Sequence, residues 1–415
     1  MTKNIQILLE TVVRCGGNCS GCALSSVERM SKSNIDWEMF EKKAQELFQY
    51  LNQQDANKVE SVSLFLGQGD HFLLSEDEMK NFVEVCSKIV PNQLRHKTTT
   101  LITASAIGKE EIIKEKMDLF YNLFLAKGMP FFIQVVFDPK KMIVNEKFSN
   151  IYINNILYFK TKCGMTELTI NVGEDLFETM SPQQFHDWTI QYGFKHVEMN
   201  WVMNKNTKFM WLKNSNHKKM FDWLKELLIL NAKDHLYEIN FVPFLSRAIN
   251  LMKDEDLVNE SLIKNISNQL SENIYIDNWG GISFCQPGLI SNIIPITERL
   301  TDSNIDLNDV ILLEKEAKNK ANLLMSKILR KKSCSGCEFV ASCLQIGSYA
   351  WIENKNEDSF NCPWDIKDFL LFFKEYINKN KEYAETKFDK NPIQNKLLMN
   401  ENNADFEYFE SRFDK

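Results

Sequence analysis

Short apolar segments alternate with helical segments through the first 250 residues, and this alternation constrains the fold most strongly. Each apolar segment has the length of a strand and is rich in branched or aromatic residues. The predicted strands cover residues 5–13, 62–66, 98–105, 130–137, 167–172, 196–202 and 237–241. Strands that alternate with helices pair in parallel through right-handed crossovers. The pattern therefore predicts an α/β fold, an open barrel of the (β/α)6 type with one extra strand.

Residues that directly follow the predicted strands are the candidate functional residues, because parallel barrels bind their ligands at the carboxyl ends of the strands. Cys15, Cys19 and Cys22 follow the first strand with the spacing C-x-x-x-C-x-x-C. Iron–sulfur clusters normally take four cysteine ligands. Three thiolates on one short loop can hold three irons of a 4Fe-4S cluster, and the fourth iron then keeps an open position. An open position implies chemistry rather than storage of electrons.

The same cysteines could instead form half of a zinc site. Zinc sites usually combine two C-x-x-C knuckles, and no matching knuckle lies near this loop in the sequence. Gly16, Gly17 and Gly21 favour the cluster, because glycine lets the backbone wrap closely around an inorganic core.

A glycine-rich turn with an acidic residue follows the second predicted strand. It consists of Gly67, Gln68, Gly69 and Asp70, and His71 comes next. Such a turn on its own is simply a connection between a strand and a helix. Its position one βα unit after the cysteines makes it a candidate part of the same site.

The cysteine spacing and the glycine-rich turn resemble the signature of the radical SAM superfamily. The resemblance implies a partial (β/α)6 barrel in which the open iron binds the amino and carboxylate groups of S-adenosylmethionine (SAM). Reductive cleavage of SAM then gives a 5′-deoxyadenosyl radical, while the protein binds, orients and shields the cofactor. In that family a Gly-Gly-Glu-Pro-like motif binds the amino group of SAM. Here Asp70 stands in place of the glutamate and His71 in place of the proline.

Polar residues at other strand ends complete the predicted SAM site. The resemblance implies contacts with the ribose and carboxylate of SAM from the ends of the fourth and fifth strands. The candidates at or near strand ends are Ser105, Gln134, Asn171 and Asn200. Each of them could equally be a polar group that closes a loop.

A second group of cysteines lies near the C-terminus. Its members are Cys334, Cys337, Cys343 and Cys362. Their spacing, with Gly280 and Cys285 upstream, resembles the SPASM and twitch extensions of radical SAM proteins. The resemblance implies one auxiliary 4Fe-4S cluster held by the four thiolates, with Cys285 spare or an alternative ligand. Gly347 stands where the full SPASM pattern has a cysteine, so a complete domain with two clusters is not expected. A tetrahedral zinc site is the alternative.

The sequence thus predicts three regions: a radical SAM partial barrel over residues 1–250, a SPASM/twitch-like module over 251–375, and a charged tail over 376–415. Cys86 and Cys163 lie on helical stretches away from both groups, and we expect them to be buried as small apolar residues.

Composition narrows the classes of partner. The net charge is −7 and no basic patch is concentrated in the sequence, which argues against nucleic-acid binding. There is no signal peptide and no apolar run of membrane-spanning length. Cysteines in metal-like spacing without an export signal predict a cytoplasmic protein that does not bind membranes.

Similar proteins with SPASM or twitch modules often crosslink or oxidise peptide and protein side chains. The resemblance therefore implies an oxidoreductase that acts on a peptide, with a flavodoxin or ferredoxin as reductant. A small-molecule substrate is the main rival, and a non-catalytic iron–sulfur or zinc protein is the third possibility. Only fourteen residues precede Cys15, so we expect no leader-recognition domain there. Gly21 stands where many relatives place an aromatic residue, so no close match to sulfatase-maturing enzymes is expected. The sequence assigns no catalytic acid or base.

Overall fold

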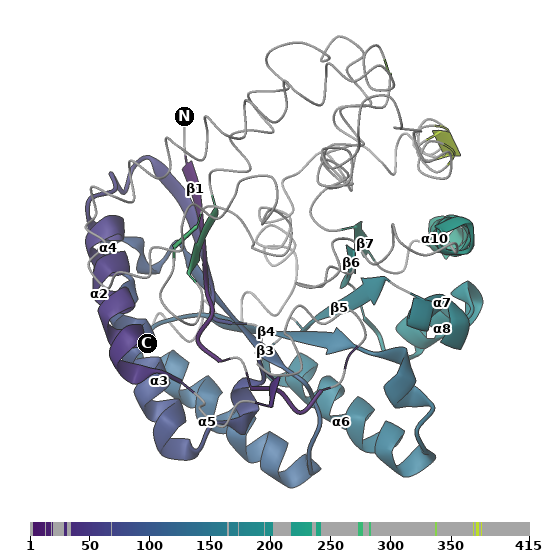
Figure 1. The fold of residues 1–415 in the computed structure, drawn as a ribbon, viewed down its shortest axis with the longest axis horizontal. Coiled ribbons are helices and arrows are strands. Elements are labelled where there is room, and N and C mark those ends of the chain that lie inside the picture. Colours follow the sequence, from purple (N-terminus) through teal and green to yellow (C-terminus); the bar gives the residue numbers. More distant parts are fainter. Residues whose placement is uncertain are drawn as a thin grey trace. The chain divides into compact units, whose positions relative to one another are not determined.

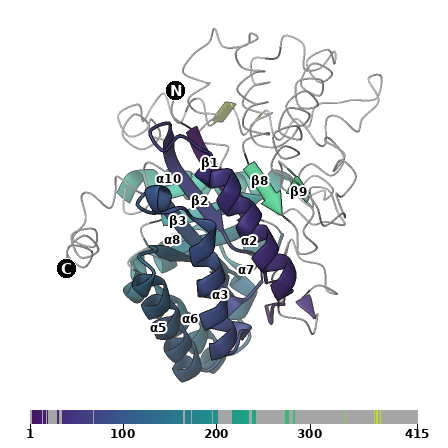
Figure 2. The ribbon, with the colours of Figure 1, turned by 90° about the vertical axis from the view of Figure 1, so that its left-hand side faces the viewer.

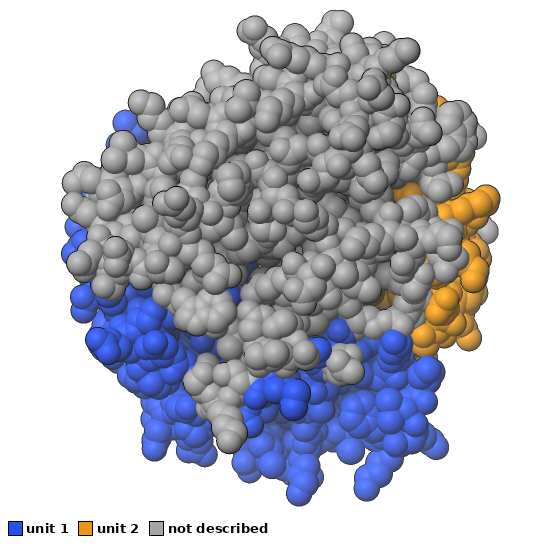
Figure 3. Space-filling view, in the orientation of Figure 1, with its two compact units in different colours: residues 1–167, 202–208, 264–325 blue, residues 168–201, 209–263, 326–415 orange. Residues whose placement is uncertain are grey.

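The structure is a computed structural model of the chain. It describes residues 3–12, 14–17, 19, 29–30, 35–67, 69–163, 166–172, 174–194, 196–201, 217–234, 238–241, 273–276, 282–283, 337, 368, 371–372 and 375. The chain divides into two compact units, which Figure 3 colours separately. Unit 1 comprises residues 1–167, 202–208 and 264–325, and unit 2 comprises residues 168–201, 209–263 and 326–415.

The strands of unit 1 form a mainly parallel sheet in the order β4-β3-β2-β1-β8-β9, of which Figure 2 labels β3, β2, β1, β8 and β9. Their bounds are Lys3–Leu9 (β1), Val59–Phe65 (β2), Thr98–Ala104 (β3), Phe131–Phe137 (β4), Asn273–Ile276 (β8) and Ile282–Ser283 (β9). Strands β1 to β4 pair in parallel with their neighbours, as the alternation predicts. The first strand ends at Leu9 and is shorter than predicted, because the chain soon after it turns into the cysteine loop.

The hairpin near residue 280 extends this sheet. Its two strands, β8 and β9, pair in antiparallel fashion. Strand β8 also pairs in parallel with β1, where Leu8 lies opposite Tyr275. The backbone N–H of Glu10 continues this ladder by donating to Ile276 O at 2.8 Å. A segment assigned by its sequence to the C-terminal module is therefore hydrogen-bonded to the first strand of the barrel, while the boundary near residue 250 stays a prediction.

Helices of unit 1 cover one face of the sheet (Figures 1 and 2). Their bounds are Trp37–Asn52 (α2), Glu76–Ile89 (α3), Asn92–Arg95 (α4), Glu110–Ala126 (α5) and Glu146–Cys163 (α6), with short 3-10 helices at His71–Leu73 (η1) and Pro139–Met142 (η2). Helix α3 buries Met79, Phe82, Val83 and Cys86, the spacing of an apolar stripe on a helix. Phe82 contacts Phe120 of α5 with ring centroids 6.2 Å apart.

A capping box begins α3, and the predicted burial of two cysteines in these helices is confirmed. Ser75 and Glu78 form the reciprocal capping box that their spacing indicates, so the first turn of α3 has its orphan N–H groups satisfied. Cys86 and Cys163 are both buried. Burial raises the pKa of each thiol, which keeps both side chains neutral and unsuited to metal binding.

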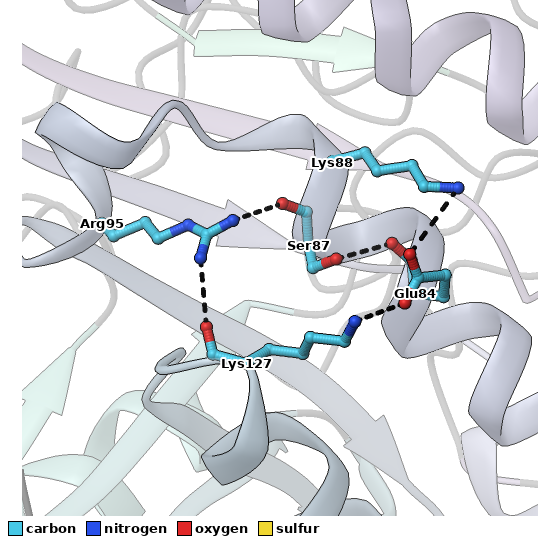
Figure 4. A network of polar contacts seen from close by, with 5 residues as sticks. All are labelled: Glu84, Ser87, Lys88, Arg95 and Lys127. Atoms are coloured by element: carbon cyan, nitrogen blue, oxygen red, sulfur yellow. Dashed lines mark hydrogen bonds and ion pairs between the residues drawn. The ribbon is translucent and has the colours of Figure 1, made fainter.

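A polar network joins the carboxyl-terminal ends of α3 and α5 through α4 (Figure 4). Arg95 donates to Ser87 O at 3.2 Å and to Lys127 O at 3.4 Å. Lys127 forms an ion pair with Glu84, which also pairs with Lys88 at 3.8 Å. The hydrogen bond from Lys127 lowers the pKa of Glu84. In a βα unit, helix ends of this kind lie at the edge of the sheet opposite the ligand site, so the network braces the unit without entering the site.

Unit 2 contains the remaining described strands, which are parallel in the order β7-β6-β5. The bounds are Thr166–Val172 (β5), Glu174–Thr179 (α7), Pro182–Gln191 (α8), His196–Trp201 (β6), His217–Asp234 (α10) and Glu238–Phe241 (β7). Ser181 and Gln184 form a second capping box before α8. Trp223 of α10 donates to Met180 O at 2.7 Å, which ties α10 to the start of α8. None of the helices in the described ranges combines the length and apolar character needed to cross a membrane.

Candidate functional site

The candidate site is built on two loops, one after β1 and one after β2, that are joined through their backbones. Gly69 N donates to Val12 O and Asp70 N donates to Arg14 O, both at 2.8 Å. The hydroxyl of Thr11 adds a bond to Leu66 O at 3.1 Å. The glycine-rich turn thus holds the backbone that leads directly into the cysteines.

This junction requires glycine at position 69. A Cβ atom on Gly69 would lie 2.4 Å from Val12 O and 2.7 Å from Arg14 O. Both obstacles are backbone atoms, which cannot move away as the end of a flexible side chain can. The two loops can approach each other only because Gly69 has no side chain. The sequence analysis considered Gly69 only as part of a SAM-binding turn and did not predict this packing role.

The described sulfur atoms of the cysteine loop gather around Gly17. Cys15 and Cys19 are both half-buried. A Cβ atom on Gly17 would lie 3.4 Å from each of the two Sγ atoms, and Gly17 N donates to Cys15 Sγ at 3.3 Å. Cys22 lies outside the described residues, and among the described ones no third cysteine, histidine or carboxylate completes a metal-binding group.

The donors present fit an iron–sulfur cluster. Soft thiolates are the ligands that such clusters use, and here two of them flank a glycine whose missing side chain leaves room beside both. Arg29 fixes the same loop, because Arg29 Nη1 donates to Gly17 O at 3.1 Å and Arg29 O accepts from Cys15 N at 3.2 Å. The N–H group of Gly17, which donates to Cys15 Sγ, is typical of the hydrogen bonds to sulfur in loops that bind such clusters.

Lys141, from a different part of the chain, also contacts this loop. It belongs to η2, after β4, and its Nζ lies 3.1 Å from Cys19 Sγ. The same Nζ lies 5.2 Å from the centre of the Tyr152 ring, within range of a cation–π interaction. Burial on its own lowers the pKa of Lys141, but Tyr152, Cys19 and Asp138 nearby outweigh it and raise the pKa above its ordinary value. Lys141 is therefore a cation at neutral pH.

The carboxylate of Asp70 is enclosed and engaged within the protein. One oxygen accepts from Phe72 N at 3.0 Å and so caps η1. The other accepts a short hydrogen bond from the hydroxyl of Ser105. Burial raises the pKa of Asp70, although the bonds from Ser105 and Phe72 and the charge of Lys141 act against this shift. The side chain predicted to bind SAM thus also fastens the turn after β2 to the turn after β3.

His71 and Thr103 extend the same connection. His71 is enclosed, with Nδ1 3.0 Å from Thr103 O. Thr103 Oγ1 donates to Gly67 O at 2.9 Å. The imidazole of His71 therefore bonds to the neighbouring strand β3.

The other predicted SAM-binding residues lie at different distances from the ends of their strands. Ser105 directly follows β3, as predicted. Gln134 lies in the middle of β4, opposite Thr103, so it is further from a strand end than the sequence pattern indicates. Asn171 and Asn200 are register partners on β5 and β6, one residue before the end of each strand. Gln68 lies outside the described residues.

The C-terminal cysteine group falls almost wholly outside the described residues. This applies to Cys285, Cys334, Cys343 and Cys362, whereas Cys337 is described as a free, half-buried thiol. The auxiliary cluster therefore stays a prediction.

Lys141 is the residue at the site that the sequence analysis did not single out. It lies four residues after β4, at the carboxyl edge where the other candidates were sought. Its position just after a strand could have marked it as a candidate site residue. Nothing local, however, marks it apart from Lys140 beside it, since its contact with Cys19 spans 122 residues of sequence.

Comparison with known proteins gives a likeness in structure alone. No protein-family model matches the sequence, and no curated protein matches it either. The solved structure of native anSMEcpe with bound AdoMet and the Kp18Cys peptide matches with a TM-score of 0.63 and 14% identity, covering 92% of this chain and 99% of that one. The structure of native anSMEcpe with bound AdoMet matches with a TM-score of 0.59, at the same identity and coverage.

The matched protein is an anaerobic sulfatase-maturating enzyme of the radical SAM type. At this identity the likeness shows the fold, and the predicted fold class is confirmed. Gly21 separates the chain from such enzymes in sequence, and the low identity agrees with that, but the fold is shared.

Proposed function

We propose that this chain, which has the fold of radical SAM enzymes, binds a 4Fe-4S cluster through Cys15, Cys19 and Cys22 and acts on a peptide or protein side chain. One observation carries the proposal: the thiols of Cys15 and Cys19 flank Gly17 at the carboxyl edge of a parallel sheet, where such a cluster fits. The third ligand, Cys22, is supplied by the spacing of the sequence.

When bound and reduced, a cluster with one open iron supplies an electron that cleaves SAM to methionine and a 5′-deoxyadenosyl radical, which removes a hydrogen atom from the substrate. The chain's own residues have other tasks. The cysteines hold the cluster, and the bonds from Gly69 and Asp70 to Val12 and Arg14 fix the loop that carries it. SAM would be bound by the residues predicted from the sequence, Gly67, Gln68, Gly69, Asp70, Ser105, Gln134, Asn171 and Asn200.

A peptide is the favoured substrate because the matched structure holds one beside AdoMet. Side-chain oxidation and crosslinking both begin with removal of a hydrogen atom, so either reaction is compatible with the proposal. The auxiliary cluster at Cys334, Cys337, Cys343 and Cys362 would accept the electron released as the substrate radical collapses. A flavodoxin or ferredoxin would reduce the first cluster.

The test is 5′-deoxyadenosine formation from SAM under reducing, anaerobic conditions, after reconstitution with iron and sulfide. The triple variant Cys15→Ala, Cys19→Ala and Cys22→Ala is expected to lose this activity. The control is Cys86→Ala, which removes a thiol from a buried helix position away from the cysteine loop and is expected to retain the activity. Cleavage by the triple variant would refute the proposal, as would a wild-type chain that takes up zinc in place of iron.

The substrate class is tested separately with deuterated Kp18Cys peptide. Transfer of deuterium into 5′-deoxyadenosine is expected if the site accepts peptides. SAM cleavage without transfer, from this peptide and from a panel of unrelated peptides, would instead favour a small-molecule substrate.

A further inference from the structure

Lys141, the lysine beside the cysteine loop, is buried, unlike an ordinary surface lysine. Lys141 is only 6% exposed, and its Nζ lies 3.1 Å from Cys19 Sγ. A Cβ atom on Gly17 would lie 3.6 Å from the same Nζ. The ammonium group therefore lies beside Gly17 together with the sulfur atoms of Cys15 and Cys19.

Several contacts hold this lysine in place. Tyr152 of α6, which is 1% exposed, lies under the ammonium group, and its hydroxyl accepts from Asp138 N at 3.2 Å. Ser149 donates to Met142 O at 2.9 Å and so fixes the end of η2 to α6. Asp138 caps η2 by accepting from Lys140 N at 3.1 Å. Enclosing a lysine costs free energy, because the ammonium group loses hydration and the side chain loses conformational freedom. The surrounding contacts must offset this cost, and the contact with the sulfur of Cys19 is one of them.

Such a contact has a definite effect on a cluster. Reduction adds one negative charge to the iron–sulfur core and its ligands. A nearby positive charge and an N–H bond to a ligand sulfur stabilise that added charge, and hydrogen bonds to sulfur are among the factors that set cluster potentials. The effect is larger for an enclosed cation than for an exposed one, because water screens the exposed charge.

We infer that Lys141 is a positioning residue that raises the reduction potential of the cluster by donating an N–H hydrogen bond to the sulfur of Cys19. The inference rests on the proposed function, since it needs a cluster on Cys19. It extends that function by naming a residue, outside the cysteine motif and the glycine-rich turn, that controls how readily the cluster accepts its electron.

The test is a redox titration of the reconstituted full chain, followed by electron paramagnetic resonance without SAM. Leaving SAM out ensures that a contact between lysine and SAM cannot cause the shift. The signal of the first cluster is the one missing from the triple cysteine variant. In Lys141→Met the ratio of reduced to oxidised cluster at a fixed potential is expected to fall at least tenfold, which equals a shift of about 59 mV to more negative potential.

Two matched variants separate the hydrogen bond from general charge. Lys141→Arg keeps a cationic N–H donor and is expected to stay within threefold of wild type. Lys140→Met removes the same charge one residue away from an exposed side chain, and its ratio is expected to change less than twofold. Equal ratios in Lys141→Met and Lys140→Met would overturn the inference.

Iron and sulfide are measured in every sample. If Lys141→Met does not hold the cluster, Lys141→Gln, which keeps a neutral N–H donor, is titrated instead and is expected to show a smaller shift in the same direction. An unchanged potential in that variant, or loss of the cluster from both, would overturn the inference. Failure of the proposed function is distinguishable, because the wild-type chain would then lack the signal before any lysine variant is compared.

Discussion

The two loops of the candidate site differ in how deeply their polar side chains are buried and in how fully these are bonded within the protein. In the cysteine loop the described sulfur atoms of Cys15 and Cys19 are only half-buried and lie on either side of Gly17. In the glycine-rich turn, by contrast, Asp70 and His71 are enclosed, and each bonds to a neighbouring part of the protein. We call the first the open loop, because its thiols are only half-buried, and the second the closed turn.

The difference shows that the glycine-rich turn acts through its backbone on the loop beside it. Gly69 and Asp70 hold the cysteine loop by main-chain hydrogen bonds, and the Asp70 side chain secures the turn that provides them. We expect substitutions in the closed turn to act first on stability. Substitutions in the open loop should act first on the cluster.

The largest effect should follow from Gly69→Ala. The new Cβ would lie 2.4 Å from Val12 O, so the two loops must separate. Overpacking against backbone should lower the unfolding free energy by roughly 3 kcal/mol, measured by chemical denaturation, and should reduce the iron bound per chain. Gly16→Ala is the control, because among the described residues nothing lies within 4 Å of a Cβ there. Equal stability of the two variants would mean that the loops are not tightly joined.

An effect of similar size concerns pH. Burial lowers the pKa of His71 to about 4, from 6.5 for a freely exposed imidazole. Between these values the unfolded chain binds a proton that the folded chain does not, so the stability that this group provides is present above pH 6.5 and is lost as pH falls through about 4. The loss amounts to roughly 3 kcal/mol.

His71→Phe provides the comparison for this prediction. Unfolding free energies of both full-length proteins between pH 7 and pH 4 should diverge in slope, with the variant less sensitive to acid. Parallel curves would show that the imidazole is not enclosed as described.

Asp70→Ala should have the next largest effect. It leaves the Ser105 hydroxyl and the Phe72 N–H without their acceptor, which should cost about 2 kcal/mol of unfolding free energy. If Asp70 also takes the place of the family's glutamate, SAM affinity measured by calorimetry should fall as well. Lower stability with unchanged affinity would mean that the acid serves the turn alone.

Much of the fold was predictable, because its signals are local. Apolar runs located the strands β1 to β7, and the pair Ser75 and Glu78 identified the start of α3. The cysteine spacing indicated where a cluster would bind. These features depend on residues close together in sequence, which is where periodicity and capping rules apply.

The features that sequence reasoning missed depend on distant parts of the chain. The pairing of β8 with β1 joins segments more than 260 residues apart, and Lys141 meets Cys19 across 122 residues. Neither pairing leaves a local pattern. The internal bonding of Asp70 was missed for a related reason, since a motif can mark a carboxylate without indicating how many of its bonds the fold already uses.

The smallest effect, from Ser75→Ala, separates stability from binding. Ser75 caps α3 just after the closed turn, and its hydroxyl accepts from Glu78 N at 3.3 Å. Its loss should lower the unfolding free energy by about 1 kcal/mol and leave iron content and SAM affinity unchanged, because the capping bonds join Ser75 and Glu78 to each other at the start of α3. Ser181→Ala, which removes the equivalent cap of α8 in unit 2, should cost a similar amount. If Ser75→Ala weakens SAM binding and Ser181→Ala does not, then loosening the start of α3 is enough to disturb the site, and a fall in affinity in Asp70→Ala would no longer identify a direct contact.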